Sequence, residues 1–310
     1  KYVIGKHPLA GYELLEEGEN GNLYVNSHAA PIGYVTNEVV SEKSYQALDF
    51  PENQTSFLWK TVAESAENDG EFPVMNAYLL EIPEINEEKN QIKKTSFGWS
   101  FSLSKEEKIS IPMKNLPVTN DLLSVRFQVK NKKDKDMYIR LCGQTNRLTA
   151  KSHEYANDNE SFAYTVTLNQ ENQTADFIFG PGEYEISNLE AFTGNISELS
   201  NEKLYETPLK LEKTEGDTLI CSVDNQEAGY LITSIPYDKG FEIRINGEKT
   251  FVEKVNTAFL GAKVPKGKCT IEISYEAEGK TLGFICTGVG IALLFGYKTR
   301  CNKKGRMVQY

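Results

Sequence analysis

Histidine is scarce in this sequence. Only three occur among 310 residues, His7, His28 and His153, and none has a cysteine or carboxylate at metal-ligand spacing. A zinc centre or a histidine base is therefore not expected. The sequence also contains no phosphate-cradling glycine loop and no nucleophile elbow. We expect no catalytic residue, no metal ion and no cofactor in this chain.

Cysteine is also rare. Of the five cysteines, Cys286 lies in the apolar C-terminal run and Cys301 in the basic tail after it, which leaves Cys142, Cys221 and Cys269. Three cysteines do not make a disulfide framework. Cys221 and Cys269 both fall on the expected inward face of their strands, so a disulfide and two buried free thiols remain open alternatives.

The chain has neither an initiator Met at its start, where Lys1 stands, nor a signal sequence. We therefore expect it to be the C-terminal piece of a longer membrane protein. Acidic residues outnumber basic residues before residue 298. Without the five cations of the tail, 29 of the 34 Lys and Arg remain, against 44 Asp and Glu. Such an acidic surface repels phosphate backbones, so no nucleic-acid partner is expected.

One uncharged run, residues 281–297, stands between Lys280 and Lys298. As a helix it would measure roughly 25 Å, slightly less than the ~30 Å hydrocarbon core of a bilayer. The alternative is a buried core helix. The run precedes a tail that is rich in Lys and Arg and lacks acidic residues, which marks the cytoplasmic side of a span. We expect a transmembrane helix over 279–298, a cytoplasmic tail over 299–310 and an extracytoplasmic bulk before them, in the cell membrane.

The rest of the chain is patterned for strands. Short runs of period-two alternation, split by polar clusters, continue from residue 72 to 192 and again from 208 to 275. We predict a mainly β fold with two β-sandwich or jelly-roll-like domains, a small N-terminal α+β segment and the C-terminal transmembrane helix. The expected boundaries are 1–70 for the α+β segment, 71–195 for the first β domain, 196–207 for a linker and 208–278 for the second β domain.

Two local signals are specific. Residues 55–68 show helical periodicity after Pro51, with Asn53 or Thr55 as the cap, and predict the only good helix before the C-terminal run. Asn246-Gly247 between two apolar runs predicts a two-residue hairpin of type I′, which needs positive φ at both positions. A strand is also predicted over 74–82, and the polar linker over 196–207 could hold one helical turn.

Three surface features could bind a ligand. Trp99, beside Gly98 and near Phe101, is a weak candidate for a sugar-stacking platform, and core packing is its alternative role. Asp134 with Asp136, and the polar run over 157–160, could offer oxygens to calcium, but neither has the full loop pattern and a solvated loop is the simpler interpretation.

A family resemblance is carried by the second β domain, over 208–278, and the residues just after it. Its motifs are Ile235-Pro236-Tyr237-Asp238-Lys239-Gly240-Phe241, Asn246-Gly247, Phe259-Leu260-Gly261, Val264-Pro265-Lys266-Gly267, and Tyr275 followed by Gly279 and Gly283. They resemble the C-terminal end of YfhO-type bacterial membrane proteins. The departures are Phe241 in place of Trp, Asn246 in place of Asp, Cys269 in place of His and Ala277 in place of Pro. We interpret Gly240 and Gly247 as supplying backbone conformations closed to other residues.

The resemblance implies a function for the longer protein. It implies a polytopic glycosyltransferase that uses lipid-phosphate sugars and decorates cell-wall or lipoteichoic acid polymers on the outer face of the membrane. The catalytic carboxylate of such enzymes lies near N-terminal transmembrane helices, so no catalytic residue is expected here. Expected partners are the membrane, a glycan or teichoic acid polymer and other envelope glycosylation proteins. The alternatives are a membrane-anchored carbohydrate-binding or adhesion module and a purely structural ectodomain.

Overall fold

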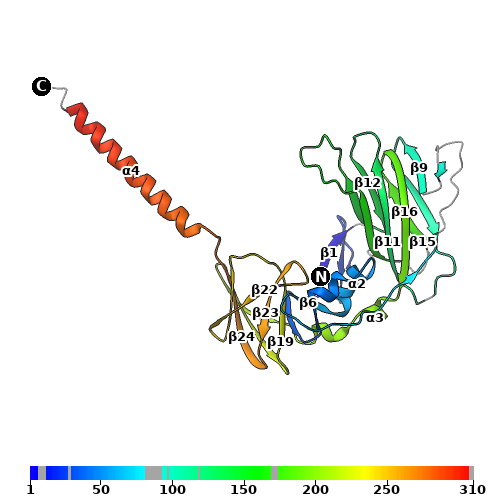
Figure 1. Cartoon of the computed structure of the whole chain (residues 1–310), viewed down its shortest axis with the longest axis horizontal. Helices are drawn as coiled ribbons and strands as arrows, with labels where there is room; N and C mark the ends of the chain where they lie inside the picture. Colours follow the sequence, from blue (N-terminus) through cyan, green and yellow to red (C-terminus); the bar gives the residue numbers. More distant parts are fainter. Residues whose placement is uncertain are drawn as a thin grey trace. The chain divides into compact units, whose positions relative to one another are not determined.

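The computed structural model describes residues 1–5, 12–26, 29–80, 93–95, 98–117, 119–168 and 174–306 (Figure 1). The chain is mainly β and ends in one long apolar helix, which confirms the predicted fold class. It divides into two compact units. Unit 1 comprises Lys1–Pro31 and Glu38–Glu206, and unit 2 comprises Ile32–Asn37 and Thr207–Tyr310, so the chain passes from one unit to the other three times.

Unit 1 contains a sandwich of two antiparallel sheets. One sheet has the order β10-β15-β12-β13, and the other has the order β14-β11-β16-β9-β8, with β7 paired to β16. The strands are β7 (Asn76–Ala77), β8 (Lys93–Thr95), β9 (Gly98–Leu103), β10 (Glu107–Pro112), β11 (Leu122–Asn131), β12 (Met137–Leu141), β13 (Gln144–Leu148), β14 (Ser161–Thr167), β15 (Thr174–Phe179) and β16 (Gly182–Gly194). The strand predicted over 74–82 is present only as β7, and its last two residues lie outside the described residues.

The core of this sandwich is formed by apolar side chains at every second position of the strands. In β11, Leu123 and Val125 are fully buried, and in β12 the same holds for Ile139 and Leu141. Since neighbouring side chains of a strand point to opposite faces, one face of each sheet supplies the core. Aromatic rings dominate its middle: Phe101 lies 5.1 Å from Phe179 and 5.0 Å from Tyr184 between ring centroids.

The N-terminal part of unit 1 combines short strands with two helices. The strands β1 (Tyr2–Gly5), β3 (Asn22–Val25) and β2 (Glu13–Glu16) form one antiparallel sheet in that order. The helices are α1 (Glu42–Gln46) and α2 (Glu52–Trp59), and the strands β5 (Val39–Ser41) and β6 (Thr61–Ala63) pair in parallel.

The helix predicted over 55–68 is wrong in its bounds. It begins at Glu52 and ends at Trp59, because Lys60 is extended at φ −140° and ψ 154°. Thr61 and Val62 continue as a buried strand paired with β5, and β-branched side chains suit a strand better than a helix. Pro51 stands at the helix start without a side-chain cap, so neither Asn53 nor Thr55 has the predicted capping role.

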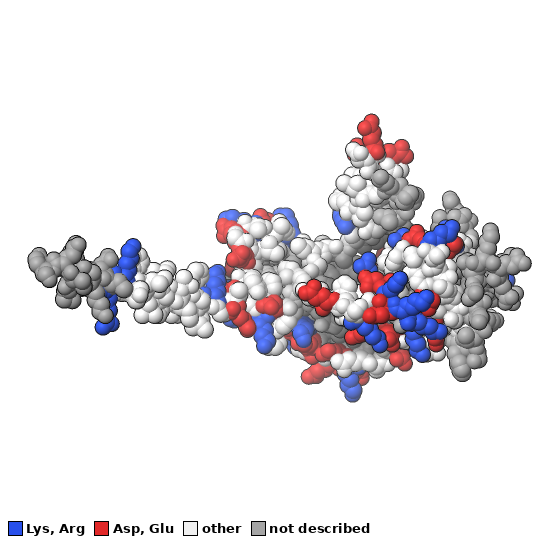
Figure 2. Space-filling model, turned by 90° about the horizontal axis from the view of Figure 1, so that it is seen from above, with Lys and Arg blue, Asp and Glu red and all other residues white. Residues whose placement is uncertain are grey.

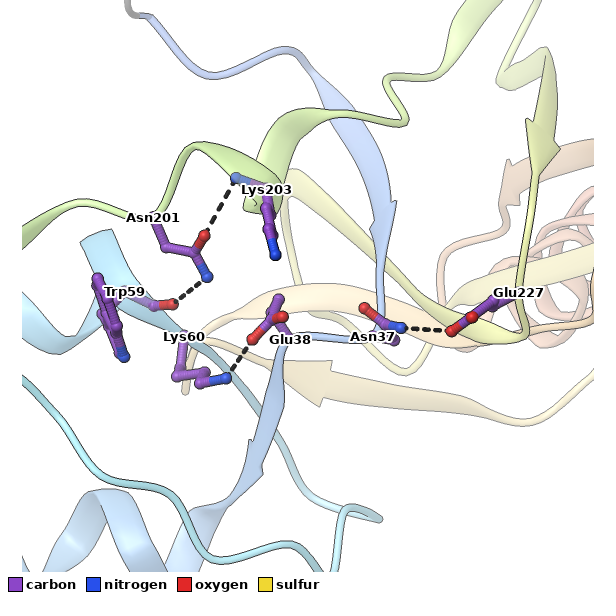
Figure 3. A network of polar contacts seen from close by, with 7 residues as sticks. All are labelled: Asn37, Glu38, Trp59, Lys60, Asn201, Lys203 and Glu227. Carbon is purple, nitrogen blue, oxygen red and sulfur yellow. Dashed lines mark hydrogen bonds and ion pairs between the residues drawn. The ribbon is translucent and has the colours of Figure 1, made fainter.

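The segment expected as a linker is ordered against α2. It forms α3 (Ile196–Leu199) and a 3-10 turn, η1 (Glu202–Tyr205). Asn201 donates from its backbone N–H to the Leu58 carbonyl (2.8 Å) and from Nδ2 to the Trp59 carbonyl (3.2 Å). These bonds satisfy carbonyls that the end of α2 leaves free, and a Lys60–Glu38 ion pair lies beside them (Figure 3).

Unit 2 is a second antiparallel sandwich. One sheet has the order β17-β18-β24-β20-β21. In the other, β4 pairs with β19, β19 with β23 and β23 with β22. The strands are β4 (Gly33–Thr36), β17 (Lys210–Glu215), β18 (Thr218–Asn225), β19 (Gly229–Pro236), β20 (Phe241–Ile245), β21 (Glu248–Thr250), β22 (Val252–Val255), β23 (Phe259–Val264) and β24 (Gly267–Tyr275).

Strand β4 joins this sandwich from far away in the sequence. Its residues Tyr34 and Val35 pair with Ile232 and Leu231 of β19. Val35 is buried in the same core as Leu231, Leu260 and Ile271. At the end of β4, the Asn37 side chain donates to Glu227 Oε2 at 2.8 Å (Figure 3). An apolar strand from the N-terminal region therefore completes unit 2.

The predicted hairpin is confirmed. Asn246 and Gly247 have φ of 52° and 84°, and Ile245 pairs directly with Glu248 across the two-residue loop. After β24 the chain forms α4 (Lys280–Arg306), which contains the apolar run. Within the described part of the chain, Lys280–Lys298 is the one helical stretch long and apolar enough to cross a membrane, and none of it is buried.

Candidate functional site

Trp99, the sugar-platform candidate, lies against the sandwich core of unit 1. It sits in β9 opposite Ile186 of β16 and is half-buried. By alternation it shares a face with Phe101 and Leu103, which are buried, and its ring packs against the same core. The structure therefore gives this ring a packing role and leaves only part of it open to a ligand.

The loop oxygens proposed for calcium already accept hydrogen bonds. Asp136 Oδ1 accepts the Ala150 N–H (2.9 Å), and Asp134 Oδ1 accepts the Ser152 N–H (3.2 Å). The hydrogen bonds from Ser152 hold the pKa of the Asp134 carboxyl below its usual value. Asn157 Oδ1 accepts the Thr149 N–H at 3.1 Å. These side chains brace two neighbouring loops, and no group of three or more metal-ligating side chains occurs among the described residues.

The histidines do not form a site in the described residues. His7 and His28 lie outside them. His153 is exposed, and its Nδ1 accepts the Tyr155 N–H at 3.0 Å. That bond supports the turn containing His153 and gives it no catalytic partner.

Cys221 and Cys269 are buried free thiols, so the disulfide alternative is not realised. They lie on adjacent strands, but Cys221 pairs with Ile271 and Cys269 pairs with Val223, so the two sulfurs are diagonal rather than opposite. Burial raises the pKa of the Cys221 thiol, which keeps it protonated and unreactive near neutral pH. Both side chains act as small apolar core residues.

The feature with the clearest functional meaning is the apolar helix α4 and its attachment to the β sandwich of unit 2. Every described side chain of α4 is exposed, including Leu282, Phe284, Leu293 and Phe295. A water-exposed helix of this length normally carries charges, and this one has none between Lys280 and Lys298. Figure 2 shows the helix white along this stretch with Lys and Arg at its two ends, whereas acidic and basic side chains are mixed over the β-rich region.

The attachment is built from the loop between β19 and β20, the turn between β17 and β18, and the end of β24. The Glu276 N–H donates to the Gly240 carbonyl at 2.9 Å, and the Tyr275 N–H donates to the Asp217 carbonyl at 3.2 Å. Beside them the Tyr275 ring lies 4.8 Å from the Phe241 ring, centroid to centroid. The negative charge of Asp238 raises the pKa of the Tyr275 hydroxyl. These contacts fix the strand end from which α4 departs.

Gly240 is required there for space rather than for conformation. Its φ lies outside the left-handed region, which corrects the expectation from the sequence, whereas Gly247 has a φ of +84° as expected. A Cβ on Gly240 would lie 2.4 Å from the Glu276 carbonyl oxygen and 2.8 Å from the Tyr275 ring. The sequence marked this loop by its Gly and Pro residues, but only the fold shows that the loop closes on the strand before the helix.

The chain then turns within a few residues. Lys280 donates its N–H to the Ala277 carbonyl (3.1 Å), Gly279 adopts a φ of +81°, and the Gly283 N–H donates to the Gly279 carbonyl (2.8 Å) to start the helix. Only Ala277, Glu278 and Gly279 separate Glu276, which is bonded to Gly240, from the start of α4 at Lys280. The arrangement can anchor unit 2 close to whatever surface the helix enters.

Comparison with known proteins identifies the relatives of this chain. The family described as bacterial membrane protein YfhO matches residues 1–287. A protein of Bacillus subtilis (strain 168), named uncharacterized protein YfhO, is 31% identical over 121 residues. That alignment covers 38% of this chain and 14% of the relative, so the chain matches only a small part of the relative's length.

Proposed function

Since the chain belongs to the YfhO family of bacterial membrane proteins, we propose that it is the extracytoplasmic C-terminal region of a polytopic glycosyltransferase that modifies cell-wall or lipoteichoic acid polymers. The chain itself is non-catalytic in this proposal. Its β units stand outside the cell, α4 spans the membrane, and the basic tail lies in the cytoplasm.

One observation carries the membrane part of the proposal. The stretch Lys280–Lys298 is wholly exposed and apolar, whereas the two β sandwiches bury large apolar cores. Leaving such a surface in water is unfavourable by about 25 cal/mol per Å² of apolar area, and burial in lipid removes that cost. The positive tail after Lys298 supports the cytoplasmic side for the C-terminus.

The enzymatic part rests on the family motifs over residues 235–283 and assigns catalysis to another part of the longer protein. Within the described residues, the polar candidates are engaged in bracing loops and strands, which supports a non-catalytic role for this chain. A glycan or teichoic acid polymer and other envelope glycosylation proteins are the proposed partners of the β units.

Two native cysteines test the sidedness. In intact bacterial cells that express the longer protein, a membrane-impermeant maleimide should label a variant retaining only Cys142, which is exposed in unit 1. A variant retaining only Cys301, in the basic tail, should react only after permeabilisation. Labelling of Cys301 in intact cells, with Cys142 protected until permeabilisation, would reverse the topology.

A sugar-transfer assay tests whether catalysis lies outside residues 1–310. Purified residues 1–310 mixed with a lipid-linked sugar and an acceptor polymer should transfer no sugar, and the longer protein should transfer it. Transfer by residues 1–310 alone would contradict the non-catalytic role. Tight binding of the fragment to one free glycan, without transfer by the longer protein, would favour the carbohydrate-binding module instead.

A further inference from the structure

Within unit 2, the connection between the β sandwich and α4 is too short to let the sandwich move away from the membrane. Glu276 is held by its bond to Gly240, and α4 begins at Lys280. Four residue steps at ~3.3–3.6 Å each span at most about 14 Å. The first residue of the helix, Lys280, therefore stays within about 14 Å of Glu276, the residue that follows β24.

The depth of α4 in the bilayer determines how far Glu276 can lie from the membrane surface. The apolar run 281–297 makes about 25 Å of helix against ~30 Å of hydrocarbon, so Lys280 is drawn to the hydrocarbon boundary. The headgroup layer adds about 5–8 Å on each side. After crossing that layer the connection has less than about 10 Å left, roughly the width of a few water molecules.

From this geometry we infer that one end of the unit 2 sandwich rests on the lipid headgroup layer. We call this end the tether face and define it by Asp217, Asp238–Gly240, Phe241 and Tyr275, which contact one another around the departure point of α4. The occupant of this face is the bilayer that α4 enters. The inference rests on the proposal that α4 spans the membrane.

The side chains of the tether face suit a headgroup layer. Tyr275 is 38% exposed beside Phe241, and amphipathic aromatic rings are enriched at membrane–water interfaces. Lys239 is exposed at the tip of the loop. Acidic residues are also present at this end, since Asp217, Asp238, Glu276 and Glu278 lie there. The short connection and the aromatic rings hold the face on the lipid, so the contact should not strengthen as the fraction of anionic lipid rises.

Two matched reporter positions test the inference in the whole chain. Lys239→Cys places a fluorescent label on the tether face, and Glu248→Cys places one beside the Asn246-Gly247 hairpin at the opposite end of β20. Five strand residues at about 3.3 Å each put roughly 15 Å between the two ends. Both side chains are exposed. Cys142, Cys286 and Cys301 are replaced by serine, while the buried Cys221 and Cys269 are kept.

The measurement is quenching of each label by lipids that carry a nitroxide on the headgroup, in liposomes containing the full chain. We expect the label at 239 to be quenched at least about twofold more than the label at 248. A third variant, in which Cys286 is kept and Cys142 and Cys301 are replaced by serine, reports whether α4 is inserted, because a label on Cys286 is shielded from aqueous iodide only inside the bilayer.

The outcomes separate the two proposals. Equal, weak quenching at 239 and 248 with Cys286 shielded would overturn the tether face and leave the span intact. Shielding of 239 from iodide without quenching by the lipid nitroxide would show a protein on this face, such as a second copy, and overturn lipid as its occupant. A label on Cys286 that iodide reaches freely would overturn the spanning role of α4 and the tether face with it.

Discussion

The backbone N–H of Glu276 donates to the carbonyl of Gly240 at 2.9 Å, and this bond joins the loop between β19 and β20 to the residue that follows the last strand before α4. The same loop places Phe241 against Tyr275. A loop 36 residues earlier in the chain thus determines where the apolar helix leaves the β sandwich. Changes in this loop should affect the attachment of the helix as well as the stability of the strands.

Gly240→Ala should loosen the end of β24. The added Cβ overlaps the Glu276 carbonyl and the Tyr275 ring, and overpacking of this kind typically costs about 1–3 kcal/mol. Hydrogen–deuterium exchange read by mass spectrometry should show faster exchange in β20 and β24. Unchanged exchange in both strands would show that the loop can move aside.

Gly247 provides the matched comparison, since it is constrained by conformation and has open space around it. Gly247→Ala should cost about 1–2 kcal/mol because its φ is positive. Gly247→Asn should recover most of that loss, because Asn tolerates the left-handed region, whereas Gly240→Asn should be worse than Gly240→Ala. If Ala and Asn had the same order of stability at both positions, the proposed difference would be contradicted, namely that Gly240 is required for space and Gly247 for its backbone conformation.

Unit 1 should lose stability in alkaline solution. Burial raises the pKa of Tyr164 and Tyr184, whose hydroxyls donate to the Ile139 and Gly180 carbonyls at 2.9 and 2.8 Å. A folded-state pKa above the unfolded value of about 10 favours the protonated, folded state. That contribution is complete below about pH 10 and declines as pH rises above it.

The measurement is urea unfolding followed by tryptophan fluorescence between pH 8 and pH 11, since both tryptophans, Trp59 and Trp99, belong to unit 1. Tyr164→Phe should lower stability by about 1 kcal/mol at pH 8 and flatten the decline above pH 10. Tyr155→Phe, at a residue that is 76% exposed, is the control and should change neither. If stability declined equally steeply above pH 10 in Tyr164→Phe, the decline would not come from ionisation of Tyr164.

The thiols should differ sharply in reactivity. Burial raises the pKa of the Cys142 thiol as well as that of Cys221, so the expected difference comes from access to the reagent. At pH 8 a maleimide should modify Cys142, whose side chain is exposed, while Cys221 and Cys269 should react only after unfolding. Mass spectrometry of digested protein locates the label. Rapid labelling of Cys269 in folded protein would mean that the core of unit 2 opens readily. The control is Cys142→Ser, which removes the signal from the exposed thiol of unit 1.

Calcium should leave the loops of unit 1 unchanged. Asp134 and Asp136 already accept backbone N–H groups, so a cation would have to displace those bonds. The midpoint of thermal unfolding should agree within error in EDTA and in millimolar calcium. Asp136→Ala should speed amide hydrogen exchange at Ala150, because the variant loses the oxygen that accepts the Ala150 N–H. A rise in the unfolding midpoint on addition of calcium would instead indicate a metal site in these loops.

Some features of this protein were determined locally by its sequence. The Asn246-Gly247 turn follows from the positive φ that these residues tolerate, and most strands follow from period-two alternation. The apolar character of residues 281–297 in α4 follows from the absence of charged side chains there. These features depend on neighbours within a few residues. They could therefore be predicted without knowledge of the rest of the chain.

Tertiary structure decided the remainder. Thr61 and Val62 fit a helical pattern, but burial beside β5 makes them a strand, and Val35 joins a core formed by residues about 200 positions later. Gly240 shows the same limit, because its need for space arises only when β24 packs beside it. Periodicity records which face of a segment is apolar, whereas the partner that covers that face is chosen by packing between segments far apart in sequence.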